Sequence, residues 1–124
     1  MGLVLESPDA PLPLRGLRDG RVWIGEADYG TSVALTPEGL LEDWAPGTLA
    51  ELATTHLDPL LAQRPDVILL GTGPRQVFPP PALLAHCLAQ GIGLEPMDNA
   101  AAARTWHVLA GEGRRVTVAF LLPG

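Results

Sequence analysis

The chain has 124 residues, the usual size of one domain, and 47% of them are hydrophobic while 18% are charged. These proportions exclude intrinsic disorder and predict a packed core. The formal net charge is −6 and no lysine occurs, so the composition disfavours binding to nucleic acids, whose phosphates an acidic surface repels.

A single cysteine, Cys87, excludes an intramolecular disulfide, and the sequence has no CxxC motif or paired Cys/His spacing. We therefore expect no metal, no cofactor and a reducing compartment, the cytoplasm. No apolar run approaches the roughly 18 residues of a membrane span, and the N-terminus lacks the basic and apolar regions of a signal peptide. We expect no insertion into a membrane.

The first part of the chain predicts short extended segments. Residues 1–20 are rich in proline and glycine, which favours an irregular arm or an edge element. Residues 21–25 and 32–35 contain Val, Trp and Ile between turn residues and predict a hairpin-like pair of strands. Residues 39–44 are a candidate third strand.

A helix is predicted next. Thr48 and Glu51 form a capping box, a pattern that satisfies free amides at a helix start, and leucines follow at helical spacing. Pro59 predicts a kink or a second start, and Pro65 predicts the end. Residues 67–70, Val-Ile-Leu-Leu, then predict a central strand covered on both faces.

The last third repeats the alternation of helix and strand. Pro80 or Pro81 opens a helix that ends at Gly91, and residues 92–95 predict a short strand. Residues 115–122 predict the final strand. The order predicts one layered α/β domain over residues 1–124.

The helix between those two strands is predicted over residues 100–110, with Asn99 as its cap. Its expected apolar stripe contains Ala101, Thr105, Val108 and Leu109. Four consecutive alanines favour the helix and its close approach to a sheet.

The turn after the buried strand has the sequence Gly71-Thr72-Gly73, where a phosphate-binding turn would lie. Pro74 has no amide to donate, and Gln76 stands where a dinucleotide fingerprint has its third glycine. We interpret this segment as a tight structural turn.

No catalytic residue is predicted. Neither serine lies in a G-x-S-x-G motif, and Cys87 falls in an apolar helical stripe. His56, His86 and His107 are far apart, and none has a metal-ligand partner four residues away.

The densest group of polar residues lies near residue 97. If the strands before residues 71 and 97 run parallel, their turns share one edge, and open α/β sheets bind ligands at that edge. A structural interpretation stands beside this one, in which Asp98 and Asn99 cap a helix and Arg104 joins Glu112 and Arg114 in a charge network. The candidate binding edge consists of Gly71, Thr72, Gly73, Arg75, Glu95, Met97, Asp98, Asn99 and Arg104.

Arg104 has a special position on its helix, about 90° from the centre of the expected apolar stripe at roughly 100° per residue. Its aliphatic stem is expected to pack on the core while its guanidinium reaches Thr72 or Asp98.

Four blocks at residues 68–73, 91–97, 103–109 and 112–116 resemble, in order and spacing, the complex I assembly factor 3-like family. The resemblance covers roughly residues 20–122. It implies a three-layer α/β fold around a mixed sheet whose last strand runs antiparallel to its neighbours, and it implies no established enzyme activity. Asn99 and Trp106-His107 depart from the threonine and Tyr-Asn of many relatives.

The resemblance implies a non-catalytic binding or assembly-assisting protein of the bacterial cytoplasm. Its partner would be another protein or an assembly intermediate of a membrane complex, held at the candidate edge. The alternative is a small-molecule binder or enzyme at the same edge, with Arg75 and Arg104 holding an anionic group and Asp98 or Glu95 accepting a proton.

Overall fold

The computed structural model describes residues 3–4 and 14–123, so most of the predicted N-terminal arm lies outside the described residues. Its elements are β1 Leu3–Val4, β2 Leu14–Arg18, β3 Arg21–Ile24, β4 Ala27–Tyr29, β5 Val33–Thr36, β6 Gly39–Leu41, the 3-10 turn η1 Leu49–Glu51, α1 Thr54–Leu61, β7 Val67–Gly71, α2 Pro81–Leu88, β8 Gly93–Met97, α3 Asn99–Gly111 and β9 Val116–Phe120.

The larger sheet is mixed, in the order β1-β6-β5-β9-β7-β8, and β2, β3 and β4 form a second, antiparallel sheet. Strand β7 pairs in parallel with both β8 and β9, while β9 pairs antiparallel with β5. The α/β prediction is confirmed. The expected antiparallel orientation of the last strand holds only toward β5, because α3 returns the chain to the starting end of the sheet, where β9 enters beside β7.

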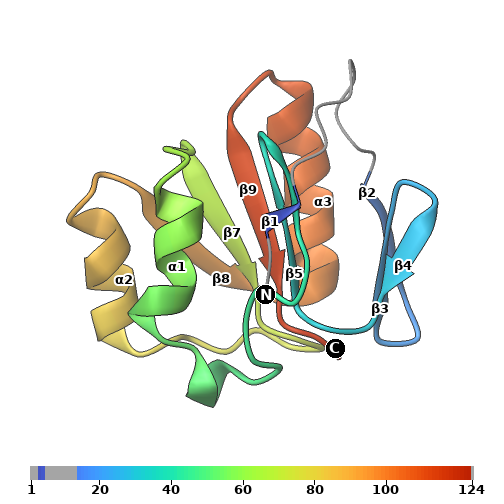
Figure 1. Ribbon diagram of the computed structural model, residues 1–124, viewed down its shortest axis with the longest axis horizontal. Helices are drawn as coiled ribbons and strands as arrows, with labels where there is room; N and C mark the ends of the chain where they lie inside the picture. The colour runs from blue at the N-terminus through green and yellow to red at the C-terminus, as the bar shows by residue number, and fades with distance from the viewer. Residues whose placement is uncertain (1–2, 5–13, 124) are drawn as a thin grey trace.

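Three layers build the molecule (Figure 1). Helices α1 and α2 cover one face of the large sheet, and α3 with the small sheet covers the other. A hydrophobic core lies on each face of the large sheet, and β7 contributes to both. Ile68 and Leu70 face α1 and α2, while Val67 and Leu69 face α3. All of β7 is buried, which confirms the prediction of a strand covered on both faces.

The first strands pair differently from the prediction. The runs at 21–25 and 32–35 do not form a hairpin with each other: β3 pairs with β2 and β4, whereas β5 pairs with β6 and β9. Gly25, with a φ of 63°, reverses the chain directly after β3 and pairs it with β4 instead. Within the predicted arm, residues 14–18 form β2, the edge strand that the sequence allowed for.

The predicted capping box does not start the long helix. Thr48 Oγ1 donates to Glu51 Oε1 at 2.9 Å, so the two side chains bind each other and only the short turn η1 follows. Helix α1 begins at Thr54, where the Nδ1 atom of His56 accepts the backbone amide of Ala53 at 2.9 Å. Pro59 lies inside this one helix, so the expected second start is absent.

The buried face of α3 is Ala102 and Ala103, with Leu109 packed beside them, whereas Val108 from the expected stripe is 59% exposed. Four alanines in succession leave the apolar period ambiguous, because each of them is small enough to face the sheet. The sheet fixes which pair is covered.

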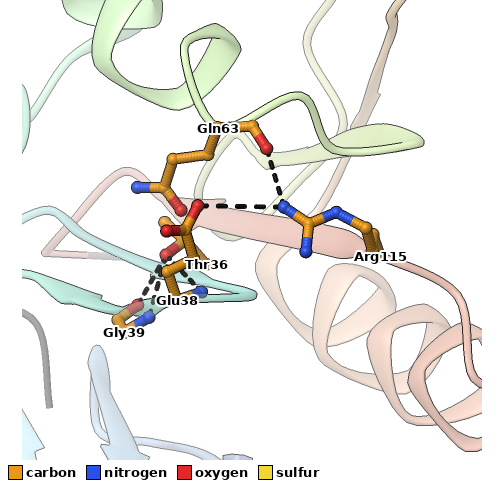
Figure 2. A network of polar contacts seen from close by, with 5 residues as sticks. All are labelled: Thr36, Glu38, Gly39, Gln63 and Arg115. Atoms are coloured by element: carbon orange, nitrogen blue, oxygen red, sulfur yellow. Dashed lines mark hydrogen bonds and ion pairs between the residues drawn. The ribbon is translucent and has the colours of Figure 1, made fainter. Parts of the chain in front are cut away.

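A polar network lies at the end of the large sheet where β9 begins (Figure 2). Arg115 Nη2 donates to the carbonyl of Gln63 at 2.7 Å and lies 3.8 Å from the Oε2 atom of Glu38. Thr36 Oγ1 donates to the carbonyl of Gly39 at 2.9 Å and holds the β5–β6 turn. The network joins that turn, the loop after α1 and the start of β9.

We predict that Leu69→Ala lowers the free energy of unfolding by about 2–5 kcal/mol, because it opens a cavity between β7 and α3. Urea unfolding followed by tryptophan fluorescence measures the change. Val108→Ala, on the exposed side of α3, is the matched control and should unfold like the wild type. A Leu69→Ala midpoint equal to that of the control would contradict the assignment of the core.

Candidate functional site

The turns after β7 and β8 lie at one edge of the large sheet. Parallel strands β7 and β8 end together, with Gly71 opposite Met97, and the amide of Thr72 donates to the carbonyl of Met97 at 2.8 Å. The end of β9 joins them, since the amide of Leu121 donates to the carbonyl of Gly71 at 2.9 Å. The structure therefore brings the two predicted turns to one place.

Asn99 holds this edge together from the inside. Its side chain is 4% exposed, its Oδ1 atom accepts the amide of Gly73 at 3.1 Å, and its Nδ2 atom donates to the carbonyl of Leu121 at 3.1 Å. Its own amide donates to the carbonyl of Gly73 at 2.8 Å. One side chain thus ties the turn after β7, the start of α3 and the segment after β9.

Gly71 is required by the same contact. A Cβ atom at this position would lie 2.2 Å from Asn99 Oδ1, which is too close for any side chain. The space that Gly71 leaves therefore accommodates the asparagine, which agrees with the interpretation of this segment as a structural turn.

Asp98, one residue before the expected cap, caps α3. Its Oδ1 atom accepts the amide of Ala101 at 2.7 Å, and its backbone is extended with φ −64° and ψ 161°. Asn99 is already the first helical residue. The sequence allowed either residue to cap, and the buried position of Asn99 decided between them.

Thr72 fixes the loop that leaves this edge. Its Oγ1 atom lies 2.7 Å from the carbonyl of Arg75 and accepts the amide of Val77 at 3.1 Å. Gln76 Nε2 donates to the carbonyl of Pro96 at 3.0 Å, which attaches the loop to β8. Residues 74–78 are exposed. These hydrogen bonds attach the loop to Thr72 at one point and to β8 at another.

This loop presents large apolar side chains to solvent. Phe78 is 72% exposed and Val77 is 45% exposed, next to the exposed Arg75. Phe78 was not among the residues that the sequence predicted for a site. The available signal was an aromatic residue outside any predicted element, directly before three prolines.

The charged residues of the predicted edge are not gathered. Arg104 is exposed on α3, and within residues 3–4 and 14–123 its guanidinium has no hydrogen bond or ion pair, so the expected contact with Thr72 or Asp98 is not formed. The predicted network of Arg104, Glu112 and Arg114 is likewise absent from the ion pairs of the described residues. Glu95 lies exposed on β8.

The nucleophile and metal candidates lie elsewhere. Cys87 is fully buried between α2 and the sheet. Burial, together with the nearby Asp58 carboxylate, raises the pKa of the Cys87 thiol. His86 Nε2 lies 2.7 Å from Asp58 Oδ1 and links α2 to α1. In the described part of the chain, no three His, Cys, Asp or Glu side chains gather as metal ligands.

A pocket of about 210 Å³ adjoins the edge. It is lined by residues 17–20 of the β2–β3 turn, residues 73–74 and residues 98–100. The β2–β3 turn thus belongs to the same surface, although it is distant in sequence. No helix of the described residues has the length and apolar character needed to cross a membrane.

Comparison with known proteins gives a family. The model of a family described as proteins of unknown function (DUF498/DUF598) matches residues 14–121. A protein of Francisella tularensis subsp. holarctica named 13 kDa major membrane protein is 28% identical over 94% of this chain and 96% of its own length. The NADH dehydrogenase [ubiquinone] 1 alpha subcomplex assembly factor 3 of Xenopus tropicalis is 32% identical over 73% of this chain.

Coverage of the relatives differs, since this chain spans about half of the Xenopus protein, 49%, and 52% of an uncharacterized Rhodobacter capsulatus protein. Solved structures agree with the fold. The NMR structure of a Xanthomonas campestris protein has 49% identity and a TM-score of 0.84, covering 100% of this chain and 94% of that one. A Bordetella pertussis Mth938-like domain has 31% identity and a TM-score of 0.80, with the same coverage. The resemblance found in the sequence is confirmed.

We predict that Asn99→Ala destabilises the protein by about 2–3 kcal/mol, because it leaves the buried amide of Gly73 and carbonyl of Leu121 without partners. Asp98→Ala, which removes only the helix cap, should cost about 1 kcal/mol. Paired urea unfolding curves give both values. Equal losses in the two variants would show that Asn99 does not tie the three segments.

We also predict that Cys87 in the native protein resists thiol labelling, since the side chain is buried and its thiolate is disfavoured. Labelling by a maleimide, followed by mass spectrometry, should proceed only after denaturant is added. Because the raised pKa keeps the thiol protonated, raising the pH to about 8.5, the ordinary thiol pKa, should not restore reactivity. Rapid modification without unfolding would return Cys87 to the list of candidate nucleophiles.

Proposed function

The chain belongs to the family of proteins of unknown function DUF498/DUF598, and from this premise we propose that it is a non-catalytic binding protein that assists the assembly of a protein complex. The relation to an assembly factor of NADH dehydrogenase supports this role. The partner we propose is a subunit or assembly intermediate of the corresponding respiratory complex, met in the cytoplasm.

The observation that carries the proposal is the exposed pair Val77 and Phe78 on a loop held by Thr72 and Gln76. Phe78 is 72% exposed. Burying such a side chain against a partner contributes about 1.5–3 kcal/mol to the free energy of binding. Because the loop is already ordered, little conformational entropy is lost on binding. Aromatic anchors of this kind dominate the energy of protein interfaces.

The polar groups of the edge support binding over catalysis. Thr72, Asp98 and Asn99 use their side chains in hydrogen bonds that hold the fold. A general acid or base needs a group free to exchange a proton with a substrate. The alternative function, an anion site with Arg75 and Arg104, would need these two guanidinium groups to converge, and Arg104 lies on the exposed side of α3.

We predict that a photo-crosslinking amino acid at position 78, expressed in the native host, captures a subunit of the respiratory complex or of its assembly intermediates. Mass spectrometry identifies the product. The same amino acid at position 108, a comparably exposed apolar site on α3, is the matched control and should capture no such subunit.

A second variant separates binding from folding. Phe78→Ser should keep the unfolding midpoint of the wild type, since the side chain is exposed, but should lower the amount of assembled complex in membranes. Crosslinks at 78 and 108 to the same proteins, or normal assembly with Phe78→Ser, would contradict the proposal.

A further inference from the structure

The outer face of the small sheet carries a second hollow, of about 350 Å³, lined by Arg15, Gly16, Leu17, Arg18 and Trp23. None of these residues belongs to the edge that the sequence predicted. Leu17 and Arg18 also line the pocket beside residues 73–74 and 98–100. The two hollows therefore adjoin at Leu17 and Arg18.

Gly16 makes the room in this hollow. It lies directly opposite Trp23 in the β2–β3 ladder, and a Cβ built on it meets no atom within 4 Å. Its φ of 137° is one that other residues rarely adopt. Trp23 is 38% exposed, and part of its indole borders the open space that the side chain of a facing residue would otherwise fill.

Two arginines, Arg15 and Arg18, line the same hollow as Trp23. The ladder shifts register between Leu14 and Gly16, so Arg15 is the extra residue of a bulge, and its Nε atom donates to the carbonyl of Gly25 at 2.6 Å. That bond fixes the side chain, and its two terminal nitrogens have no partner in the described chain. Among the described residues, Arg18 pairs with Asp19 alone, at 3.9 Å between Nε and Oδ2, and its side chain is 82% exposed.

The neighbouring arginine shows the contrast. Arg21 is paired with Asp28 on the adjacent strand. Among the described residues, Arg15 has no carboxylate partner, and Arg18 has only the long, exposed ion pair with Asp19. On a chain with a net charge of −6, two such cations beside an exposed tryptophan are a local attraction for carboxylates. Arginine and tryptophan are also the residues most enriched at the centres of protein interfaces.

From these contacts we infer that the outer face of the β2–β3 hairpin binds an extended acidic segment of a partner protein. A carboxylate pairs with Arg15 and Arg18, and an adjoining apolar side chain lies over Gly16 against Trp23. Two open hollows that adjoin at Leu17 and Arg18 fit an extended chain better than a small anion, which is usually held in an enclosed pocket. The inference rests on the proposed function and names the chemistry of its partner.

The test uses the full-length protein labelled with ¹⁵N, whose three tryptophans give three indole N–H signals. Trp23→Phe assigns the signal of interest, while Trp44 is buried and donates to the carbonyl of His56. The probe is a capped peptide with glutamates on both sides of a leucine. The comparison peptide has glutamine in place of each glutamate.

We expect the glutamate peptide to shift the Trp23 signal to saturation and the glutamine peptide to leave it unchanged. The double variant Arg15→Ala/Arg18→Ala should bind the glutamate peptide about tenfold more weakly, as expected from two exposed ion pairs. Arg114→Ala, which removes an exposed arginine elsewhere, is the control and should bind like the wild type. Added salt should weaken binding.

Three results would overturn the inference: no shift with the glutamate peptide, equal shifts with both peptides, or inorganic phosphate shifting Trp23 as far as the peptide does. The outcome is separable from that of the proposed function. Peptide binding without crosslinking at position 78 would remove the assembly role and keep this site. Specific crosslinking at 78 without peptide binding would do the reverse.

Discussion

The side chain of Asn99 makes the contacts on which the candidate binding edge depends. Its amide oxygen and nitrogen satisfy the turn after β7 and the chain after β9, while its backbone begins α3. Three segments far apart in sequence meet around one buried amide. Without it, the amide of Gly73 and the carbonyl of Leu121 would have no partner. Gly71 is the complement of this arrangement, because any Cβ there would displace the amide.

The exposed features of this end follow from that constraint. With Gly73 fixed by Asn99, the chain leaves the edge in a defined direction, and Thr72 and Gln76 hold the next residues. Phe78 is thereby presented rather than buried. Within the edge, the side chains of Thr72, Asp98 and Asn99 are engaged in hydrogen bonds that hold the fold.

The small sheet extends the surface beside the candidate binding edge. It packs on the same side of the large sheet as α3 (Figure 1), and its inward residues Val22 and Ile24 belong to the core shared with α3. Alternation along β3 then places Trp23 outward. The bulge and Gly16 open space beside the indole, so the hairpin contributes charge and an aromatic ring next to the edge where the Phe78 loop begins.

The sequence alone determined the α/β class, the buried strand β7, the family and the turn residues at the carboxyl ends of β7 and β8, because continuous apolar runs and glycine-rich turns are local signals. It predicted Asn99 as the cap of α3 and Ala101 in the apolar stripe, whereas Asp98 is the cap and Ala102 and Ala103 face the sheet, because neighbouring residues satisfy the same local pattern. Only the tertiary structure decided these points, and it alone joined the β2–β3 hairpin to the edge and exposed Phe78, because burial and pairing depend on segments distant in the chain. Arg104 shows the same limit, as its orientation depended on which face of α3 the sheet covered.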